Sequence, residues 1–282
     1  MRRIFGLILM LQSVFLSGQM PPVAHTDALF SALDRAFNEA LDPTPEDEYY
    51  IGRAVAANIL ASHEIYISNP ELIIYLNHIC QALVINSNYP SPFNGYYVTI
   101  LNSPEFNAFA TPGGHIFLTR GLIEAAPCED GLAGIIAHEL AHIMLRHGMK
   151  IIDDMKITEE IDLMARQAAA FSNRQTAVFR DSVNEMFYAM ARNGYSVPQE
   201  YEADMMALKL LAAAGYNPGG LPEMLNILQK VQRSQSGGFN DTHPTPAQRI
   251  ENLEKQMPLY RMADNNAVRQ KRFIGIMKRN LN

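Results

Sequence analysis

The sequence is poor in several residue types, and each shortage narrows the range of functions. Its 282 residues include no tryptophan and only two cysteines, and neither cysteine has a second one at the spacing of a metal-binding pair. The formal net charge is −6, and no segment interleaves aromatic side chains with Lys and Arg, so nucleic acid is not an expected partner. No repeat, low-complexity tract or long linker is present, which favours one compact domain. A hydrophobic fraction of 48% is sufficient for a core.

Long hydrophobic runs are also scarce, except at the N-terminus. There, Arg2 and Arg3 precede an apolar run over residues 4–16. A membrane-spanning helix needs about 20 apolar residues, so this shorter run is typical of a secretory signal peptide, with an uncleaved membrane anchor as the alternative. We predict a signal peptide over residues 1–24, cleaved between residues 18 and 24, and one domain over residues 25–282.

Export permits a disulfide between the two cysteines without requiring one. Cys80 lies in LIIYLNHICQALV, at helical spacing from Ile73, Leu76 and Val84. This pattern predicts that Cys80 is a small, buried apolar side chain.

The remaining chain alternates helical patterns with one short β-prone region, which predicts a mainly helical α+β fold. Short β-prone runs, YYVTIL, FNAFA and HIFLTR, lie between residues 90 and 120 and predict a small sheet. The helical patterns cover residues 45–64, 71–87, 131–148 and 198–214, a segment after NPGG, and HPTPAQRIENLEKQ. For residues 151–192 we predict one long helix or a helical hairpin. This segment either covers the cleft as a lid or forms part of the core. The last residues form a basic tail, for which we predict a solvated face.

The segment IIAHELAHIMLRHG carries the strongest chemical signal. His138 and His142 are four apart, so on a helix both imidazoles face the same side and can bind one zinc ion. Glu139 is turned about 100° from His138 and can stand beside an open coordination position. A carboxylate there suits a general base that takes a proton from an attacking water and delivers it to a leaving amine.

The alternative is a core helix that carries two histidines without a metal. Three ionisable residues in an otherwise apolar helix are costly to bury without partners, and metal coordination would supply these partners. His147 is about half a turn away from the metal face, so we expect a histidine at the helix C-terminus rather than a ligand, with Gly148 as the residue that ends the helix.

A third metal ligand is sought in PQEYEADMMALKLL, which offers Glu200, Glu202 and Asp204. Glu200 and Asp204 share one helix face, whereas Glu202 is turned about 200° from Glu200. We predict that Glu200 binds the metal and that Asp204 accepts a hydrogen bond from the distal N–H of a metal-bound imidazole. An acidic, solvated helix start is the alternative.

HELAH, followed later by EYEAD and preceded by NAFATPGGHIFLTRGLI, resembles the HtpX/BepA family of zinc metalloendopeptidases, in particular its periplasmic BepA-like branch. IGRA, GYNPGG and THPTPAQRI extend the resemblance over most of the chain. It implies a zincin-like (gluzincin) domain whose small sheet has an edge strand lining the active-site cleft. It also implies one Zn²⁺ per chain, bound by His138, His142 and Glu200, with Glu139 as the base.

The same resemblance suggests further roles. Asn107, Ala108 and Phe109 match the family's edge strand, which binds substrate backbone; an interior strand is the alternative. His243 matches a histidine that occupies the fourth zinc position as a latch; a histidine at a helix start without metal contact is the alternative. Arg249 is either an oxyanion stabiliser or half of a surface ion pair.

Together these features predict a zinc-dependent endopeptidase that hydrolyses misfolded or unassembled polypeptides in the periplasm of a Gram-negative bacterium, and that is self-inhibited by a histidine latch. Peripheral association with a membrane or an assembly machinery is compatible with this prediction. The tetratricopeptide domain of the branch has no counterpart in this sequence, so a role in outer-membrane protein assembly is not carried over. The alternatives are a latent, chaperone-like client-binding protein with a mainly structural zinc, and a zinc hydrolase of non-peptide substrates.

Overall fold

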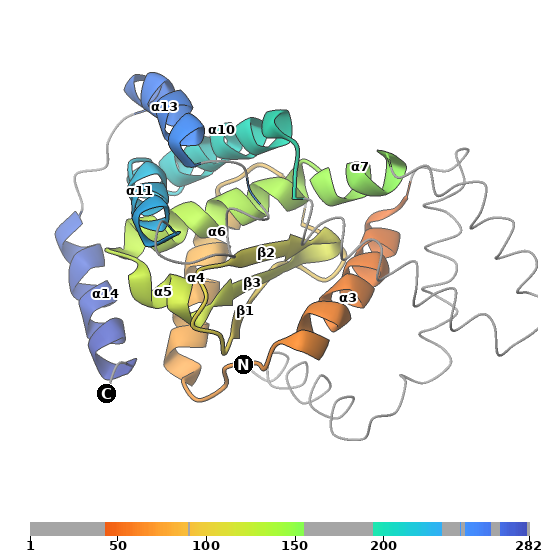
Figure 1. The fold of residues 1–282 in the computed structure, drawn as a ribbon, viewed down its shortest axis with the longest axis horizontal. Helices are drawn as coiled ribbons and strands as arrows, with labels where there is room; N and C mark the ends of the chain where they lie inside the picture. Colours follow the sequence, from red (N-terminus) through yellow and green to blue (C-terminus); the bar gives the residue numbers. More distant parts are fainter. Residues whose placement is uncertain are drawn as a thin grey trace, which may run out of the picture.

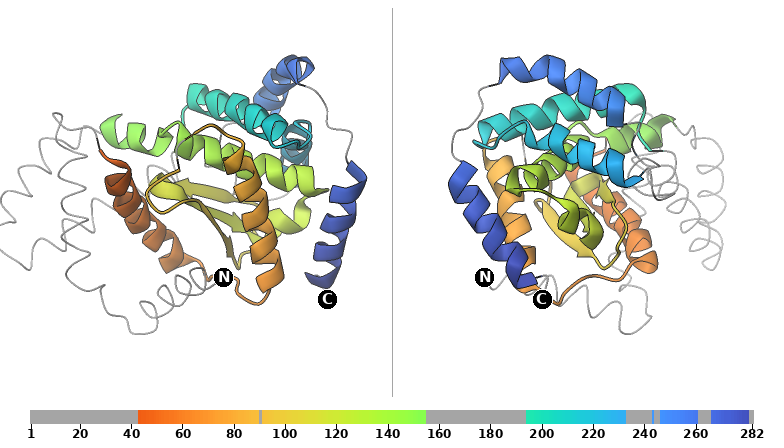
Figure 2. Two further views of the ribbon diagram at one scale, coloured as in Figure 1. Left: turned by 180° about the vertical axis from the view of Figure 1, so that it is seen from behind. Right: turned by 60° about the vertical axis from the view of Figure 1, so that its left-hand side comes forward.

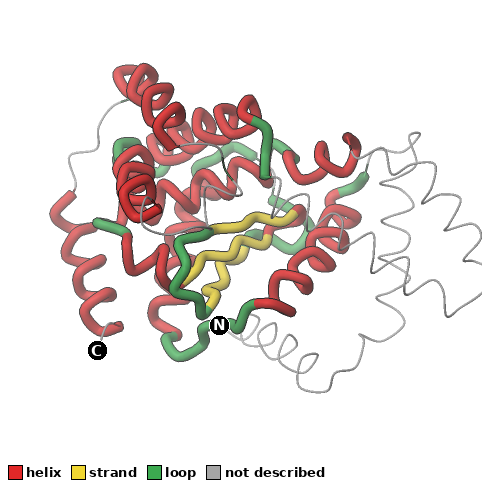
Figure 3. Tube along the Cα trace, viewed as in Figure 1, coloured by secondary structure: helices red, strands yellow, loops and turns green. Residues whose placement is uncertain are grey.

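The computed structural model describes residues 43–89, 91–154, 194–232, 243, 246–260 and 266–280. Helices surround a small sheet, which confirms the predicted α+β fold (Figures 1 and 3). None of the described helices is long and apolar enough to cross a membrane. The predicted signal peptide lies outside the described residues, as does nearly all of the segment 151–192, for which we predicted a long helix or a hairpin.

The helices and short 3-10 turns follow the sequence patterns closely. The structure contains α3 (Pro45–Ser62), α4 (Pro70–Ile85), η1 (Pro112–Gly114), α5 (Arg120–Ala125), α6 (Glu129–Met144), α7 (His147–Asp154), α10 (Val197–Ala213), α11 (Gly220–Gln232), α13 (Pro246–Gln256), η3 (Met257–Leu259) and α14 (Asn266–Asn280). Side chains that the sequence places before the helices cap them: Thr44 and Asp47 form a capping box on α3, and Asn69 caps α4.

The sheet has three strands, β1 (Tyr97–Leu101), β2 (Ala108–Thr111) and β3 (His115–Thr119), in the order β1-β3-β2. β1 runs parallel to β3, and β2 runs antiparallel to it, so β2 is an edge strand. The turn between β2 and β3 needs glycine, because Gly113 has φ +75° and a Cβ there would lie 2.3 Å from the Tyr49 Cα atom in α3.

Helix α6 is the centre of the fold. Every residue from Glu129 to Ile143 is buried, because the helix runs between the sheet on one side and α10 and α11 on the other (Figures 1 and 2). Gly134 allows α11 to approach closely, since a Cβ at this position would lie 2.8 Å from the Leu221 Cα atom of α11. Cys80 of α4 is fully buried in the same core, as predicted, and both Cys80 and Cys128 are free thiols.

The end of α6 differs from the sequence prediction. We predicted a continuous helix that ends at Gly148, but α6 stops at Met144 and Arg146 adopts a left-handed conformation with φ +57°. Gly148 lies inside the next helix, α7. The Arg146 guanidinium pairs with Glu48, at 2.7 Å, and donates to the Pro43 carbonyl oxygen, at 3.2 Å. These two contacts hold a backbone conformation that non-glycine residues rarely adopt.

The prediction of a solvated basic tail is wrong for Arg269, which is buried, and it omits the buried ion-pair partner of the half-exposed Arg272. Helix α14 packs against α4 and α6, and Arg269 forms an ion pair with Asp130 at 3.0 Å. Arg272 holds the buried Glu129 through both carboxylate oxygens, and the Tyr75 hydroxyl donates to the same carboxylate at 2.8 Å. The tail therefore neutralises two carboxylates in the first turn of α6.

Candidate metal centre

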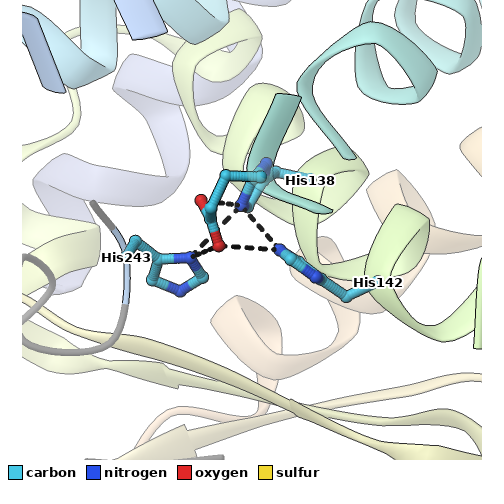
Figure 4. Close-up of side chains that lie close together, drawn as sticks. His138, His142 and His243 are labelled. Atoms are coloured by element: carbon cyan, nitrogen blue, oxygen red, sulfur yellow. Dashed lines mark hydrogen bonds and ion pairs between the residues drawn. The ribbon is translucent and has the colours of Figure 1, made fainter. Parts of the chain in front are cut away.

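The two histidines of α6 point into one site from adjacent helical turns. Their Nε2 atoms lie 3.0 Å apart, and both side chains are buried (Figure 4). Two imidazole nitrogens at this distance are a poor pair on their own, since one of them must act as the donor. A shared metal ion satisfies both lone pairs.

Helix α10 brings Glu200 to the same point because it packs directly against α6. The Glu200 carboxylate lies 3.5 Å from His138 Nε2 and 3.4 Å from His142 Nε2. Glu200 is fully buried, so the predicted alternative of an acidic, solvated helix start does not describe it.

His243 completes the cluster from the chain just before α13. Its Nδ1 atom lies 2.7 Å from Glu200 Oε1 and 3.4 Å from His138 Nε2 (Figure 4). Ligand atoms of His138, His142, Glu200 and His243 all lie within 4.8 Å of one another. Tetrahedral zinc with bonds of 2.0–2.1 Å separates its ligand atoms by about 3.4 Å, so these three nitrogens and one oxygen fit a single zinc ion.

Glu139 stands beside this cluster. Its side chain is fully buried, and neither carboxylate oxygen has a hydrogen-bond partner among the described residues. Burial raises the pKa of the Glu139 carboxyl, although the neighbouring His243 and His138 oppose this rise. His243 Nε2 lies 3.7 Å from Glu139 Oε1, beyond hydrogen-bond distance. A buried carboxylate without a hydrogen bond is costly, which is typical of a group kept for chemistry rather than for stability.

Asp204 and Arg249 support His138 from behind the cluster. The Asp204 Oδ1 atom lies 3.0 Å from His138 Nδ1, and Arg249 donates to both Asp204 oxygens, at 2.9 and 2.6 Å. Although burial alone would raise it, Arg249 and His138 lower the pKa of the Asp204 carboxyl to about 2. Arg249 Nη1 also lies 3.1 Å from Glu200 Oε2, and the Arg249 side chain is 1% exposed. Its ion pairs are therefore buried, so the predicted alternative of a surface ion pair is wrong.

The predicted substrate strand lies at the sheet edge that packs against α6. Asn107 precedes β2: its N–H donates to Thr119 Oγ1 at 2.9 Å, and its carbonyl oxygen accepts from the Thr119 N–H at 3.0 Å. Because hydrogen-bonded pairs alternate along an antiparallel ladder, the backbone groups of Ala108 and Ala110 point away from β3. The Ala108 N–H donates to Asn107 Oδ1 at 2.9 Å.

Two residues lie beside the site in a way that the sequence analysis did not predict: Tyr195 was not recognised, and His147 was expected to point away. The Tyr195 ring stacks on His142 with centroids 3.9 Å apart, and no periodic pattern marks it because it precedes α10. His147 Nδ1 lies 2.9 Å from His142 Nδ1, although a continuous helix would have turned it away. Glu202, which we predicted to face elsewhere, does point away from the metal ligands and lies 3.2 Å from His147 Nε2.

The helix-borne histidine pair, the carboxylate from a second helix and the small sheet beside them define a zincin-like metallopeptidase domain. Residues 73–257 match Peptidase family M48, which is well over half of the chain. The chain therefore belongs to peptidase family M48.

Two groups of curated relatives are similar to this chain. The mitochondrial metalloendopeptidase OMA1 of Arabidopsis thaliana is 31% identical over 58% of this chain and 33% of its own length. The beta-barrel assembly-enhancing proteases of Yersinia pestis and Escherichia coli are each 26% identical, over 86% and 65% of this chain and 51% and 38% of their own lengths. The chain thus spans between one third and about half of the length of these relatives.

Proposed function

We propose that this protein is a zinc-dependent endopeptidase that hydrolyses misfolded or unassembled proteins in the periplasm of a Gram-negative bacterium. One observation carries the proposal: His138, His142 and Glu200 converge on a single point, and the Glu139 carboxylate beside them has no hydrogen-bond partner within the described part of the chain. Membership of peptidase family M48 supports peptide-bond hydrolysis as the reaction.

His138, His142 and Glu200 would hold one Zn²⁺ ion. When bound, zinc supplies a Lewis acid that polarises the scissile carbonyl and lowers the pKa of a water. Glu139 would accept a proton from the attacking water on a carboxylate oxygen and deliver it to the leaving amine. Asp204 would keep the proton of His138 on Nδ1, so that Nε2 faces the metal, and Arg249 would hold Asp204 in place.

His243 is proposed as a latch. A catalytic zinc site uses three protein ligands and leaves one position for water or substrate, whereas a fourth protein ligand closes it. The short distances from His243 Nδ1 to Glu200 and His138 support a closed form, in which the fourth position is taken. Displacement of His243 would then activate the enzyme. Arg249 is less suited to the oxyanion role, since its guanidinium already pairs with Asp204 and Glu200.

The segment Asn107 to Phe109 and its extension to Ala110 are proposed to bind the backbone of an unfolded substrate by strand addition. Replacement of Asn107 by Pro would also remove its bond to Thr119, so it is a poor test. Ala110→Pro is sharper, because the Ala110 N–H points away from β3 and edge strands tolerate proline there. We expect KM for an unfolded substrate to rise while zinc content stays unchanged; an unchanged KM would contradict strand addition.

The periplasmic location is proposed from the signal-like segment 1–24 and from the relatives named as beta-barrel assembly-enhancing proteases. Unfolded or misassembled polypeptides are the proposed substrates, and peripheral association with a membrane or an assembly machinery is part of the proposal. Cell fractionation tests the location, and recovery of the protein in the cytoplasmic fraction would contradict it.

The test of the activity is degradation of an unfolded model protein by the wild type, Glu139→Gln and His243→Ala, with zinc content measured for each. Glu251→Gln serves as a matched control, because Glu251 lies on the exposed face of α13. We expect His243→Ala to cut faster than the wild type, and Glu139→Gln to keep its zinc and lose cleavage. Equal cleavage by Glu139→Gln would remove Glu139 as the base.

A client-binding protein with a structural zinc is the second candidate, because four ligands including His243 give a closed site. It predicts that the wild type and His243→Ala both hold zinc and bind unfolded protein, while neither cleaves it. The buried Glu139 carboxylate, which accepts no hydrogen bond from any residue that the structure describes, favours the peptidase, since a structural site has no use for a base.

A further inference from the structure

The two histidines of α6 have different partners on their distal nitrogens. Asp204 Oδ1, which also accepts a hydrogen bond from Arg249, lies 3.0 Å from His138 Nδ1. The corresponding nitrogen of His142 instead meets another imidazole, since His147 Nδ1 lies 2.9 Å away. The side chain of His147 is fully buried, so this contact is sheltered from water.

The break between α6 and α7 is what brings His147 to this position. In a continuous helix, residues five apart are turned about 140° from each other, so the two rings would not meet. The left-handed conformation of Arg146 redirects the chain, and His147 then points back at His142. Conformations of this kind are unfavourable for residues other than glycine and persist where the surrounding structure fixes them, here through the contact of Arg146 with Glu48.

We infer that His147 is a positioning residue for His142, and that Glu202 in turn orients His147. This inference rests on the proposed zinc site. When His142 binds zinc through Nε2, its remaining proton is on Nδ1, and this N–H donates to His147 Nδ1. His147 then carries its own proton on Nε2 and donates it to Glu202 Oε2, 3.2 Å away. In this series of hydrogen bonds, His142 and His147 each donate one N–H to one acceptor.

This series of hydrogen bonds ends at Glu202, which lies at the protein surface. The Glu202 side chain is 57% exposed and also lies 3.8 Å from the Lys150 ammonium group. A carboxylate shared with water and with a lysine holds its partner less firmly than the buried Asp204 does. We therefore place the larger effect on His147 and the smaller effect on Glu202.

The experiment compares zinc affinity, measured by chelator competition, for the wild type, His147→Ala, His147→Gln and Glu202→Ala. The visible absorption spectrum of the Co²⁺-substituted proteins reports the ligand geometry, and circular dichroism reports the fold. His78→Ala is the matched control, because His78 lies on α4 with its side chain exposed. None of these readouts requires peptidase activity.

We expect His147→Ala to weaken zinc binding by about 10- to 100-fold and to change the Co²⁺ spectrum, as loss of a supporting hydrogen bond does at other sites. Glutamine can accept from His142 and donate to Glu202, so His147→Gln should recover most of the affinity. Glu202→Ala should lose less than His147→Ala, and His78→Ala should match the wild type.

Three results would overturn the inference. Wild-type affinity and an unchanged Co²⁺ spectrum in folded His147→Ala would show that His147 does not position His142. A loss in His147→Gln as large as that in His147→Ala would assign the effect to ring packing instead of hydrogen bonding. A wild type that binds no zinc would overturn the proposed metal site and this inference with it. Zinc binding without cleavage by either the wild type or His243→Ala would remove only the peptidase proposal.

Discussion

Replacement of Arg249 by Met should destabilise the protein strongly. The guanidinium is 1% exposed and donates twice to Asp204, and it also lies 3.1 Å from Glu200 Oε2. Methionine fills much of the space of the arginine stem, so the dominant loss is the charge that compensates two buried carboxylates. Breaking a buried pair in this way costs about 3–5 kcal/mol. For a domain of this size the melting temperature should fall by roughly 6–20 °C.

The assay is urea and thermal denaturation of metal-free protein, so that zinc does not mask the loss at Glu200. Arg249→Met combined with Asp204→Asn should lose less than Arg249→Met alone, because the double variant buries one charge fewer. Lys255→Met is the matched control, since Lys255 pairs with Glu251 on an exposed helix face. A melting temperature for Arg249→Met equal to that of Lys255→Met, or strict additivity in the double variant, would refute the reasoning.

Three further predictions follow from packing, burial and metal binding. Gly134→Ala should cost about 1–3 kcal/mol in denaturant unfolding, because its Cβ would lie 2.8 Å from the Leu221 Cα atom. Gly275→Ala should instead stabilise by about 0.5–1 kcal/mol, because its Cβ would meet no atom of the described residues within 4 Å beyond its own helical turn; equal effects would contradict this. Burial raises the pKa of the Cys80 thiol to about 12, so a thiol reagent should label Cys128 in the folded protein and Cys80 only after unfolding, as mass spectrometry can check. Chelation should lower the melting temperature, since zinc at about 1,000 times its dissociation constant adds about 4 kcal/mol; an unchanged melting temperature after chelation would speak against a metal site.

Helical periodicity was sufficient to predict which of the proposed ligands share a helix face on α6 and on α10. His138 and His142 are four residues apart on α6, and Glu200 and Asp204 are four residues apart on α10. Neither helix is interrupted between its two residues, so the relative positions of these side chains follow from helix geometry alone. The structure brings these faces together because α6 and α10 pack directly against each other. His243 could be predicted only through the family resemblance, since no local pattern links it to residues on distant helices.

The surroundings of these ligands depend on features that local patterns do not report. The left-handed Arg146 is held by Glu48, which is remote in the sequence, so the end of α6 and the position of His147 were predicted incorrectly. The partners of Arg269 and Arg272 lie on α6, so a basic segment without acidic neighbours in the sequence was read as solvated. In both regions the structure is set by ion pairs between residues that are far apart in the sequence.

The complete burial of α6 has a mechanical consequence. A helix covered on every side cannot shift without repacking the whole core, and Glu200 on α10 is equally enclosed. His243 precedes α13, the helix whose Arg249 forms an ion pair with Asp204. In the proposed site, His138, His142 and Glu200 therefore form a rigid frame, and His243 is the proposed ligand that can leave it. Under this proposal, a regulator that displaces His243 would switch the enzyme on reversibly, without cleaving a bond and without unfolding the frame.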